Sequence, residues 1–327
     1  MASRTLKAVL LGDARGIRRA FDETDASAKK LGGAFTTLQG KLGAVFGVAG
    51  LAGGAAMAVK AFADMDTGMR EVFTLMPGIS AEAMGSMTDD VKAFSREYGL
   101  TTTQVIPALY QAISAGVPPE NVFTFMETAA KMARGGATDL QTAVDGLSTA
   151  VNAYGVEALS AEDASDIMFT GMRLGKTTIG ELSGALFQVV PVASAAGVGF
   201  DQITAALTAI TLQGAPTNVA ATNLRGALVE LGKEGTIAFL AFEKAAGQTF
   251  PEFIDAGGTL QEAFDLMAVA AEADGSAIQN SFGSIEAGMA ATVLSSDTGS
   301  AQFGSNMDAM AERAGSGETG LAPRGVA

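Results

Sequence analysis

The sequence contains neither cysteine nor histidine, and these two absences remove most familiar reaction chemistries from a chain of 327 residues. Without cysteine there are no disulfides and no thiol nucleophiles. Without histidine there are no imidazole bases and no zinc-finger ligand sets. An enzyme built on this chain would depend on carboxylates, a lysine or a phosphate-binding loop. The sequence therefore predicts no catalytic residue, no bound metal and no cofactor.

Aromatic residues are also scarce, at 6% of the chain, and tryptophan is absent. Nucleic-acid recognition by aromatic stacking is therefore not expected. By contrast, 48% of the residues are hydrophobic, with 41 glycines and 15 methionines. A chain of this length can bury a substantial core, and its small residues with adaptable methionines favour closely packed helices.

Charge is divided unevenly near residue 60. Up to that point nine basic residues oppose four acidic ones, a balance of +5, whereas the remaining 12 basic and 31 acidic residues give −19. The acidic body disfavours DNA binding through phosphates, so sequence-specific nucleic-acid binding is not expected. The basic head either meets an acidic protein surface or an anionic membrane, or only solvates a helix.

Residues 42–59 form an uncharged run of 18 residues. Its length suffices for a thin bilayer crossing, and its larger apolar side chains would be the membrane-inserting ones: Leu42, Phe46, Leu51, Met57 and Val59. Glycine and alanine contribute little to transfer into lipid. A packing helix or flexible joint therefore remains the alternative interpretation.

Beyond residue 60 the apolar residues follow helical spacing, and no run of strand alternation is present. Four pairs have the spacing of a capping box, which marks helix starts: Thr101 with Gln104, Thr138 with Gln141, Thr178 with Glu181, and Thr259 with Glu262. Pro191 interrupts an apolar run and is expected to kink or divide its helix. The fold class predicted is all-α.

One helical unit is written twice, over about residues 101–155 and 178–232. The segments 108–111 and 185–188 are offset by 77, whereas the later pairs Gly116-Val117 and Gly197-Val198 are offset by 81. A slip of four residues corresponds to one extra helical turn. Repeated helical hairpins bury their apolar faces against neighbours, which suits a scaffold better than an enzyme.

Few polar constellations suggest chemistry. The glycines at 50–54 lack the lysine and hydroxyl residue of a phosphate loop. Asp163 and Asp166 share a helix face and would hold a cation or act as an acid/base pair, although charges placed at a helix start explain them more simply. Arg225 and Glu230 are predicted to make a charge contact at the edge of an apolar helix.

Between residues 138 and 228 an ordered set of motifs appears: LSTAVNAYG at 147–155, DASD at 163–166, GKTTIGEL at 175–182, PVASAAGV at 191–198, AALTAITLQG at 205–214 and ATNLRGAL at 221–228. Together they resemble the core region of phage tail tape measure proteins. The pattern is carried by Tyr154, Gly155, Asp166, Gly175, Thr178, Pro191, Gly197, Thr211, Gly214, Leu224 and Arg225.

The resemblance implies a helical structural protein of a tailed bacteriophage or prophage. Such a protein occupies the lumen of the tail tube, sets tail length during assembly in the host cytoplasm, and is released on infection to assist genome ejection. The partners implied are the tail tube protein, tail assembly chaperones, tail tip or baseplate hub proteins, further copies in a low-copy oligomer and the host inner membrane. Family members are generally longer, which predicts a short or truncated version here.

The expected organisation has four parts. A basic, amphipathic helical segment at 1–41 is followed by a Gly/Ala-rich apolar helix at 42–63, a helical core at 64–290 and a flexible tail at 291–327. Two other functions remain open. The apolar run would serve a membrane pore or holin-like protein, and a glutamate or aspartate would serve a glycan-cleaving enzyme.

Overall fold

The computed structural model describes residues 60–312, and no strand occurs among them, which confirms the all-α class. The chain divides into two units, residues 1–66 and 67–327. In the first unit, residues 60–66 are helical, and Lys60 Nζ lies 2.7 Å from the Asp64 carboxylate. The predicted helix at 1–41 and residues 42–59 of the apolar helix lie outside the described residues.

In the second unit, residues 67–74 are helical and precede a long series of helices. These are α2 (Ala81–Tyr98), α3 (Thr102–Ser114), α4 (Val122–Gly135), α5 (Leu140–Tyr154), α6 (Ala161–Leu174), α7 (Ile179–Ala195), α8 (Phe200–Leu212), α9 (Thr217–Gly232), α10 (Ile237–Ala246), α11 (Phe250–Asp255), α12 (Leu260–Ala273), the 3₁₀ helix η1 (Ile278–Ser281), α13 (Ile285–Ser295) and α14 (Asp297–Ala311).

The helix starts reveal a repeat about half as long as the predicted one. Helices α3, α5, α7 and α9 begin at positions 102, 140, 179 and 217, so the offsets between successive starts are 38, 39 and 38. Helices α4, α6 and α8 begin at 122, 161 and 200, with offsets of 39 and 39. The offset of 77 found in the sequence therefore spans two repeats, and the repeating unit is one helical hairpin.

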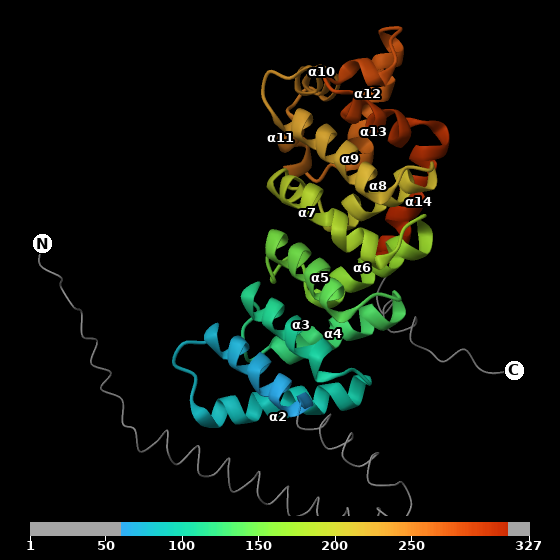
Figure 1. Cartoon of the computed structure of the whole chain (residues 1–327). Helices are drawn as coiled ribbons and strands as arrows, with labels where there is room; N and C mark the ends of the chain where they lie inside the picture. Colours follow the sequence, from blue (N-terminus) through green and yellow to red (C-terminus); the bar gives the residue numbers. More distant parts are fainter. Residues whose placement is uncertain (1–59, 313–327) are drawn as a thin grey trace, which may run out of the picture. The chain divides into compact units, whose positions relative to one another are not determined.

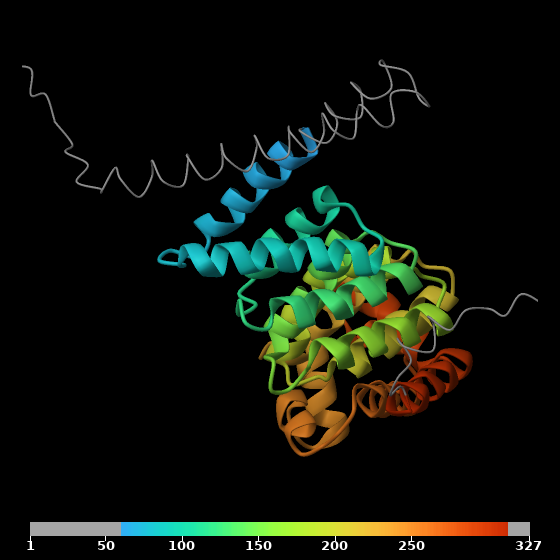
Figure 2. The ribbon, with the colours of Figure 1, turned by 90° about the horizontal axis from the view of Figure 1, so that it is seen from below.

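The hairpins stack in two rows (Figure 1). In one row α3 packs on α5, α5 on α7 and α7 on α9, and in the other α4 packs on α6 and α6 on α8. Figure 2, seen from the α2 side, shows helices of successive hairpins lying behind one another. Each hairpin thus buries its apolar face against the next, as in repeat proteins built by nearest-neighbour contacts.

The four-residue slip between the two copies is one turn of helix, as predicted. Helix α3 has 13 residues, whereas its counterpart α7 has 17. Both helices then end in the same turn. Gly116 and Gly197 adopt positive φ values of 92° and 74°. The amide N–H groups of the following valines donate to Ala112 and Ala193, at 3.1 and 3.0 Å. This left-handed closure favours glycine because it has no Cβ.

The prediction of a flexible tail at 291–327 is wrong for its first part, because α13 extends to Ser295 and α14 covers Asp297–Ala311. Helix α13 packs on α9, and α14 packs on α8, so this pair takes the next place in the stack. The buried side of α14 carries Phe303, Asn306 and Met310, and Asn306 Nδ2 donates to the Ala205 carbonyl at 3.1 Å. This helix is hard to recognise in the sequence because it is rich in small residues and its apolar face is narrow. Residues 313–327 lie outside the described range.

Three of the four predicted capping boxes are present, at Thr101, Thr178 and Thr259. The prediction at Thr138 is wrong. Asp139 is the N-cap of α5, and one of its carboxylate oxygens accepts from the Thr142 amide at 2.9 Å. The hydrogen bonds from the Thr142 side chain and amide lower the pKa of Asp139. Carboxylate accepts this bond better than threonine does, which moves the helix start by one residue.

Helix α7 is not divided at Pro191, and the alternative expectation, a kink at this residue, stays a prediction. Helix α7 runs without interruption from Ile179 to Ala195, with Pro191 inside its last turns and exposed. Proline removes the hydrogen bond to the carbonyl four residues earlier, which is that of Phe187. Phe187 is itself 64% exposed, so water reaches this side of the helix. The continuing contacts of α7 with α5 and α9 hold the helix together.

Glycines bring neighbouring helices close together at two crossings. A Cβ on Gly146 of α5 would lie 2.8 Å from the Cβ and 3.2 Å from the Cα of Ser183 on α7. A Cβ on Gly171 of α6 would lie 2.6 Å from Thr204 Cγ2 on α8. Both rows of the stack therefore depend on the absence of a side chain at one position.

Replacing Gly146 tests this dependence. We expect Gly146→Val to lower the free energy of unfolding by about 1–3 kcal/mol, because the added atoms separate α5 from α7. Gly184→Ala on α7 is the matched control, since nothing lies within 4 Å of its Cβ. This control should stabilise by about 0.5–1 kcal/mol, as expected for an unhindered helical glycine. Denaturant unfolding measures both, and equal effects of the two substitutions would contradict the close crossing.

Candidate functional site

The predicted family-pattern residues gather mainly at the two edges of the stack, where helices end and turn. Tyr154, Gly155 and Gly197 lie at the edge formed by the C-terminal ends of α5 and α7. At the other edge lie Gly175, Thr178, Thr211 and Gly214, around the α6–α7 and α8–α9 connections. The remaining members, which are Asp166, Pro191, Leu224 and Arg225, lie within helices. The pattern therefore marks joints between repeats.

At the first edge, polar side chains bind the carbonyls that a helix end leaves without partners. Asn152 Nδ2 donates to the Ala115 carbonyl at 2.8 Å, and Ser194 Oγ donates to the Ala153 carbonyl at 2.6 Å. The Tyr154 hydroxyl donates to the Val198 carbonyl at 2.8 Å. Each bond joins one hairpin to the next, so this edge is fixed by helix-end carbonyls.

The Tyr154 side chain is partly buried at this edge, and burial alters its ionisation. Its ring stands edge-on to Phe200, with the ring centroids 5.9 Å apart. Burial, followed by the negative charge of Asp201, raises the pKa of the Tyr154 hydroxyl. At neutral pH the hydroxyl therefore stays protonated and donates a hydrogen bond.

At the second edge, there is little room for a side chain at Gly175. A Cβ there would lie 3.0 Å from the Gly171 carbonyl oxygen and 3.1 Å from both Thr208 Cγ2 and Thr211 Oγ1. Thr178 caps α7, with its Oγ1 accepting from the Glu181 amide at 3.1 Å. The Thr177 and Thr217 hydroxyls lie 2.8 Å apart and join the α6–α7 connection to the start of α9.

Inside the row, two hydrogen bonds repeat at equivalent positions. Gln111 Nε2 of α3 donates to Asp145 Oδ1 of α5 at 2.8 Å. The Thr222 hydroxyl of α9 donates to Gln188 Oε1 of α7 at 2.7 Å. Both residues of the second pair lie 77 positions after those of the first. The duplicated sequence thus preserves a contact between hairpins as well as helix starts.

The predicted contact between Arg225 and Glu230 does not form. Arg225 is exposed, and Glu230 accepts instead from the amides of Gly283 and Ser284 at 2.6 and 2.9 Å and from the Ser284 hydroxyl at 2.6 Å. These donors lie at the start of α13. A carboxylate at a helix N-terminus is favoured by the unpaired amides and the helix dipole there. Glu230 therefore attaches α9 to α13.

One residue of the predicted aspartate pair, Asp163, also has a structural role. Asp163 lies in the first turn of α6 and accepts from the Ser160 hydroxyl at 2.7 Å, while its amide donates to that hydroxyl at 3.0 Å. Asp166 is buried on the same helix. No group of three acidic side chains able to hold a metal occurs within residues 60–312.

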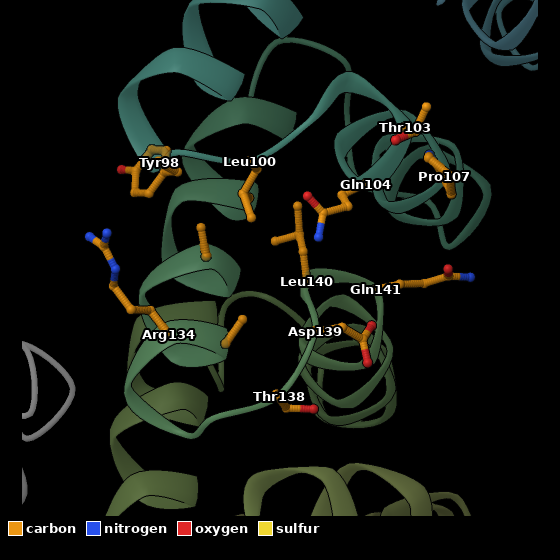
Figure 3. Close-up of a pocket in the computed structure, with 12 residues that line it drawn as sticks. Tyr98, Leu100, Thr103, Gln104, Pro107, Arg134, Thr138, Asp139, Leu140 and Gln141 are labelled. Atoms are coloured by element: carbon orange, nitrogen blue, oxygen red, sulfur yellow. The ribbon is translucent and has the colours of Figure 1, made fainter. Parts of the chain in front are cut away.

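Sequence reasoning missed a hollow at the second edge. A cavity of about 380 Å³ lies between the end of α2, the start of α3, the end of α4 and the start of α5. Figure 3 shows Leu100, Gln104 and Leu140 around this cavity, with Arg134 near Tyr98 at its rim. Burial, then the negative charges of Glu127 and Glu97, raises the pKa of Tyr98 to about 12.

A second cavity, of about 400 Å³, adjoins the first. Leu100 lines both, and the second is completed by Lys92, Ser95, Arg96 and Thr102. The two cavities are therefore neighbours at the end of α2, and together they are here called the α2–α4 groove. Its cations were visible in the sequence, but their arrangement becomes apparent only once the single-hairpin repeat is known.

The candidate membrane-inserting residues Leu42, Phe46, Leu51, Met57 and Val59 lie outside the described residues. Within residues 60–312, no helix combines the length and the hydropathy that a bilayer crossing requires.

Comparison with known proteins identifies the family. A family model described as phage-related minor tail protein matches residues 88–283, which include the whole series from α3 to α12. The chain belongs to this family of phage tail proteins. No solved structure shows a significant match.

Two curated relatives confirm the resemblance to tape measure proteins. A probable tape measure protein of Clostridium phage phiCD119 is 33% identical over 96% of this chain. The tape measure protein of Pneumococcus phage Dp-1 is 22% identical over 64% of it. The aligned regions cover 34% and 18% of those two proteins, so the chain spans only a minor part of their length.

Removing the Tyr154 hydroxyl tests the first edge. We expect Tyr154→Phe to lower the free energy of unfolding by about 1 kcal/mol at neutral pH, because the Val198 carbonyl loses its donor. Tyr110→Phe is the control, since this ring is 39% exposed and its hydroxyl has no hydrogen bond within residues 60–312.

The effect of Tyr154→Phe on the free energy of unfolding should also depend on pH. Because the pKa of Tyr154 is raised in the folded protein, its contribution is complete below the pKa of an unfolded tyrosine, about 10, and declines above it. The stability difference between wild type and Tyr154→Phe should therefore shrink as the pH rises above about 10. Denaturant unfolding across this range measures it, and a constant difference would refute the assignment.

Proposed function

We propose that this chain acts as a tape measure protein in the tail of a bacteriophage or prophage. In this role it occupies the tail tube lumen, sets tail length during assembly and leaves the tail on infection to assist genome ejection. The supporting observation is family membership combined with the names of the two relatives. A stack of helical hairpins whose polar residues bind helix ends is also consistent with a structural, non-enzymatic protein.

The proposed partners follow from the same role. They are the tail tube protein, the tail assembly chaperones and the tail tip or baseplate hub proteins, with a few copies of the chain associating together. The host inner membrane would be reached through residues 42–59. The chain would pass from the host cytoplasm during assembly to the virion tail.

The repeat gives the ruler hypothesis a quantitative form. In the compact stack, each hairpin adds one layer of about 8–10 Å along the stack. Drawn out as continuous helix, the same hairpin would measure about 57 Å, at about 1.5 Å per residue. A protein that measures a tube by its length therefore gains about sixfold in reach by being drawn out.

Deleting one hairpin tests the proposal. Removal of residues 140–178 joins Asp139, the N-cap of α5, directly to Ile179, the first residue of α7, and so preserves the repeat. We expect tails shortened by about 58 Å if the chain is extended in the tube, and by about 10 Å if it stays compact. Electron microscopy of purified tails measures the change.

The matched control restores the length with a different sequence. In this variant a second copy of the segment 179–216 replaces the segment 140–178, which leaves the chain a single position shorter than wild type. Its tails should have the wild-type length to within about 2 Å of ruler. Tails of unchanged length in the deletion variant would reject the ruler function, whereas loss of tails in both variants would show that residues 140–178 are needed for assembly itself.

A further inference from the structure

Cations are scarce on the body of this protein, and most of them lie at one edge. Residues 61–312 contain 10 basic and 30 acidic residues, a net charge of −20. Six of the ten basic residues lie at or near the C-terminal ends of α2, α4 and α6: Lys92, Arg96, Lys131, Arg134, Arg173 and Lys176. This edge therefore holds most of the cations of the body, and acidic residues such as Asp89, Glu97 and Glu127 lie among them on the same helices.

Three of these residues recur with the period of the fold. Arg96, Arg134 and Arg173 are 38 and 39 positions apart, and each lies in the last turn of its helix. Helix α2 contacts α4, and α4 contacts α6. Since packed helix axes are about 8–10 Å apart, the helix turns that carry the three arginines are expected to follow one another at about that spacing. The three residues are here called the arginine row.

Stabilisation of helix C-terminal ends would account for each arginine taken alone. Helix-end stabilisation does not explain why the guanidinium groups remain available to a ligand. All three are exposed, and Arg134 and Arg173 form no hydrogen bond or ion pair within residues 60–312. Arg96 uses only its Nε, which donates to the Lys92 carbonyl at 3.0 Å. The two lysines on the same helices are paired instead, Lys92 with Asp89 and Lys131 with Glu127.

The arginine row borders the α2–α4 groove, which supplies a second and independent feature. Arg96 and Arg134 lie on its rim, while Leu100, Pro107 and Leu140 give it an apolar lining. Ser95 also lines the groove and is only 8% exposed, and its Oγ is buried without a hydrogen-bond partner. A buried hydroxyl without a partner is costly, so a ligand that satisfies it gains affinity.

We propose that the arginine row and the α2–α4 groove bind an acidic amphipathic helix of a partner protein. Carboxylates seven residues apart on a helix are about 10.5 Å apart, which matches the spacing of the arginine row. Those carboxylates face Arg96, Arg134 and Arg173. An apolar side chain of the same helix enters the groove at Leu100, and a polar group beside it bonds to Ser95 Oγ.

Two other occupants match this surface less well. Residues 1–60 of this chain carry +5, which is the same sign as the arginine row. Tyr98 is the single aromatic residue lining the groove, which leaves little surface for the base stacking that a single-stranded nucleic acid uses. An acidic helix needs only the local row of cations and an apolar pocket.

The test uses the full chain and a synthetic probe, and it does not depend on the ruler function. The probe is a fluorescent helical peptide with three glutamates seven residues apart and leucines between them. A control peptide of the same composition has its glutamates adjacent. Fluorescence anisotropy should show that the spaced peptide binds at least about tenfold more tightly, and that added salt weakens its binding.

Charge-reversed variants locate the site. The triple variant R96E/R134E/R173E should lose about tenfold or more in affinity for the spaced peptide. The matched variant R225E/K233E/K244E changes the net charge by the same amount away from the groove and should change the affinity by less than about threefold. Where circular dichroism shows that the first triple variant does not fold, the R96Q/R134Q/R173Q variant replaces it, with the same loss expected.

Ser95→Ala separates binding from folding. It should weaken peptide binding several-fold without lowering the stability of the free protein, because the hydroxyl has no partner there. Equal losses in the two charge-reversed variants, or no binding to the wild-type chain, would overturn the proposal. So would a single-stranded oligonucleotide that displaces the peptide and binds more tightly to the same arginines.

Discussion

Burial of one hairpin against the next is the interaction on which the rest of this structure depends. A single amphipathic hairpin leaves an apolar face open to water, and the stack closes that face by placing an equivalent hairpin on it. The contacts of α5 with α7 and of α7 with α9 form the centre of this arrangement. Glycine at the crossings then brings the helices close, as at Gly146 against Ser183.

Polar residues in this fold mostly serve the same purpose at the edges. Tyr154, Ser194 and Asn152 donate to carbonyls at helix ends, and Glu230 accepts from amides at the start of α13. These bonds satisfy backbone groups that repeated helix termini would otherwise leave unpaired. They show that these polar side chains are used for joining helices.

Much of this fold could be predicted from the sequence because its signals are local. Helix starts at Thr101, Thr178 and Thr259 follow from capping boxes within four residues, and the extra turn of α7 follows from the slip between the two copies. Errors arose where a stronger neighbour intervened. Asp139 displaced Thr138 as a cap, and packing against α5 and α9 kept α7 whole at Pro191.

The site was less predictable because it depends on spacing between distant residues. The true period, that of a single hairpin, is hidden in the sequence, since only alternate hairpins resemble one another closely enough to be noticed. Without that period, Arg96, Arg134 and Arg173 are three separate surface charges. Glu230 shows the same limit, because its partners at Gly283 and Ser284 lie more than fifty positions away.

The contacts of α14 make the two ends of the stack mechanically unequal. Most hairpins contact only their immediate neighbours, but α14 contacts both α6 and α8 and so clasps two layers at once. The end of this unit that carries α14 should therefore resist separation under tension more strongly than the end that carries α2.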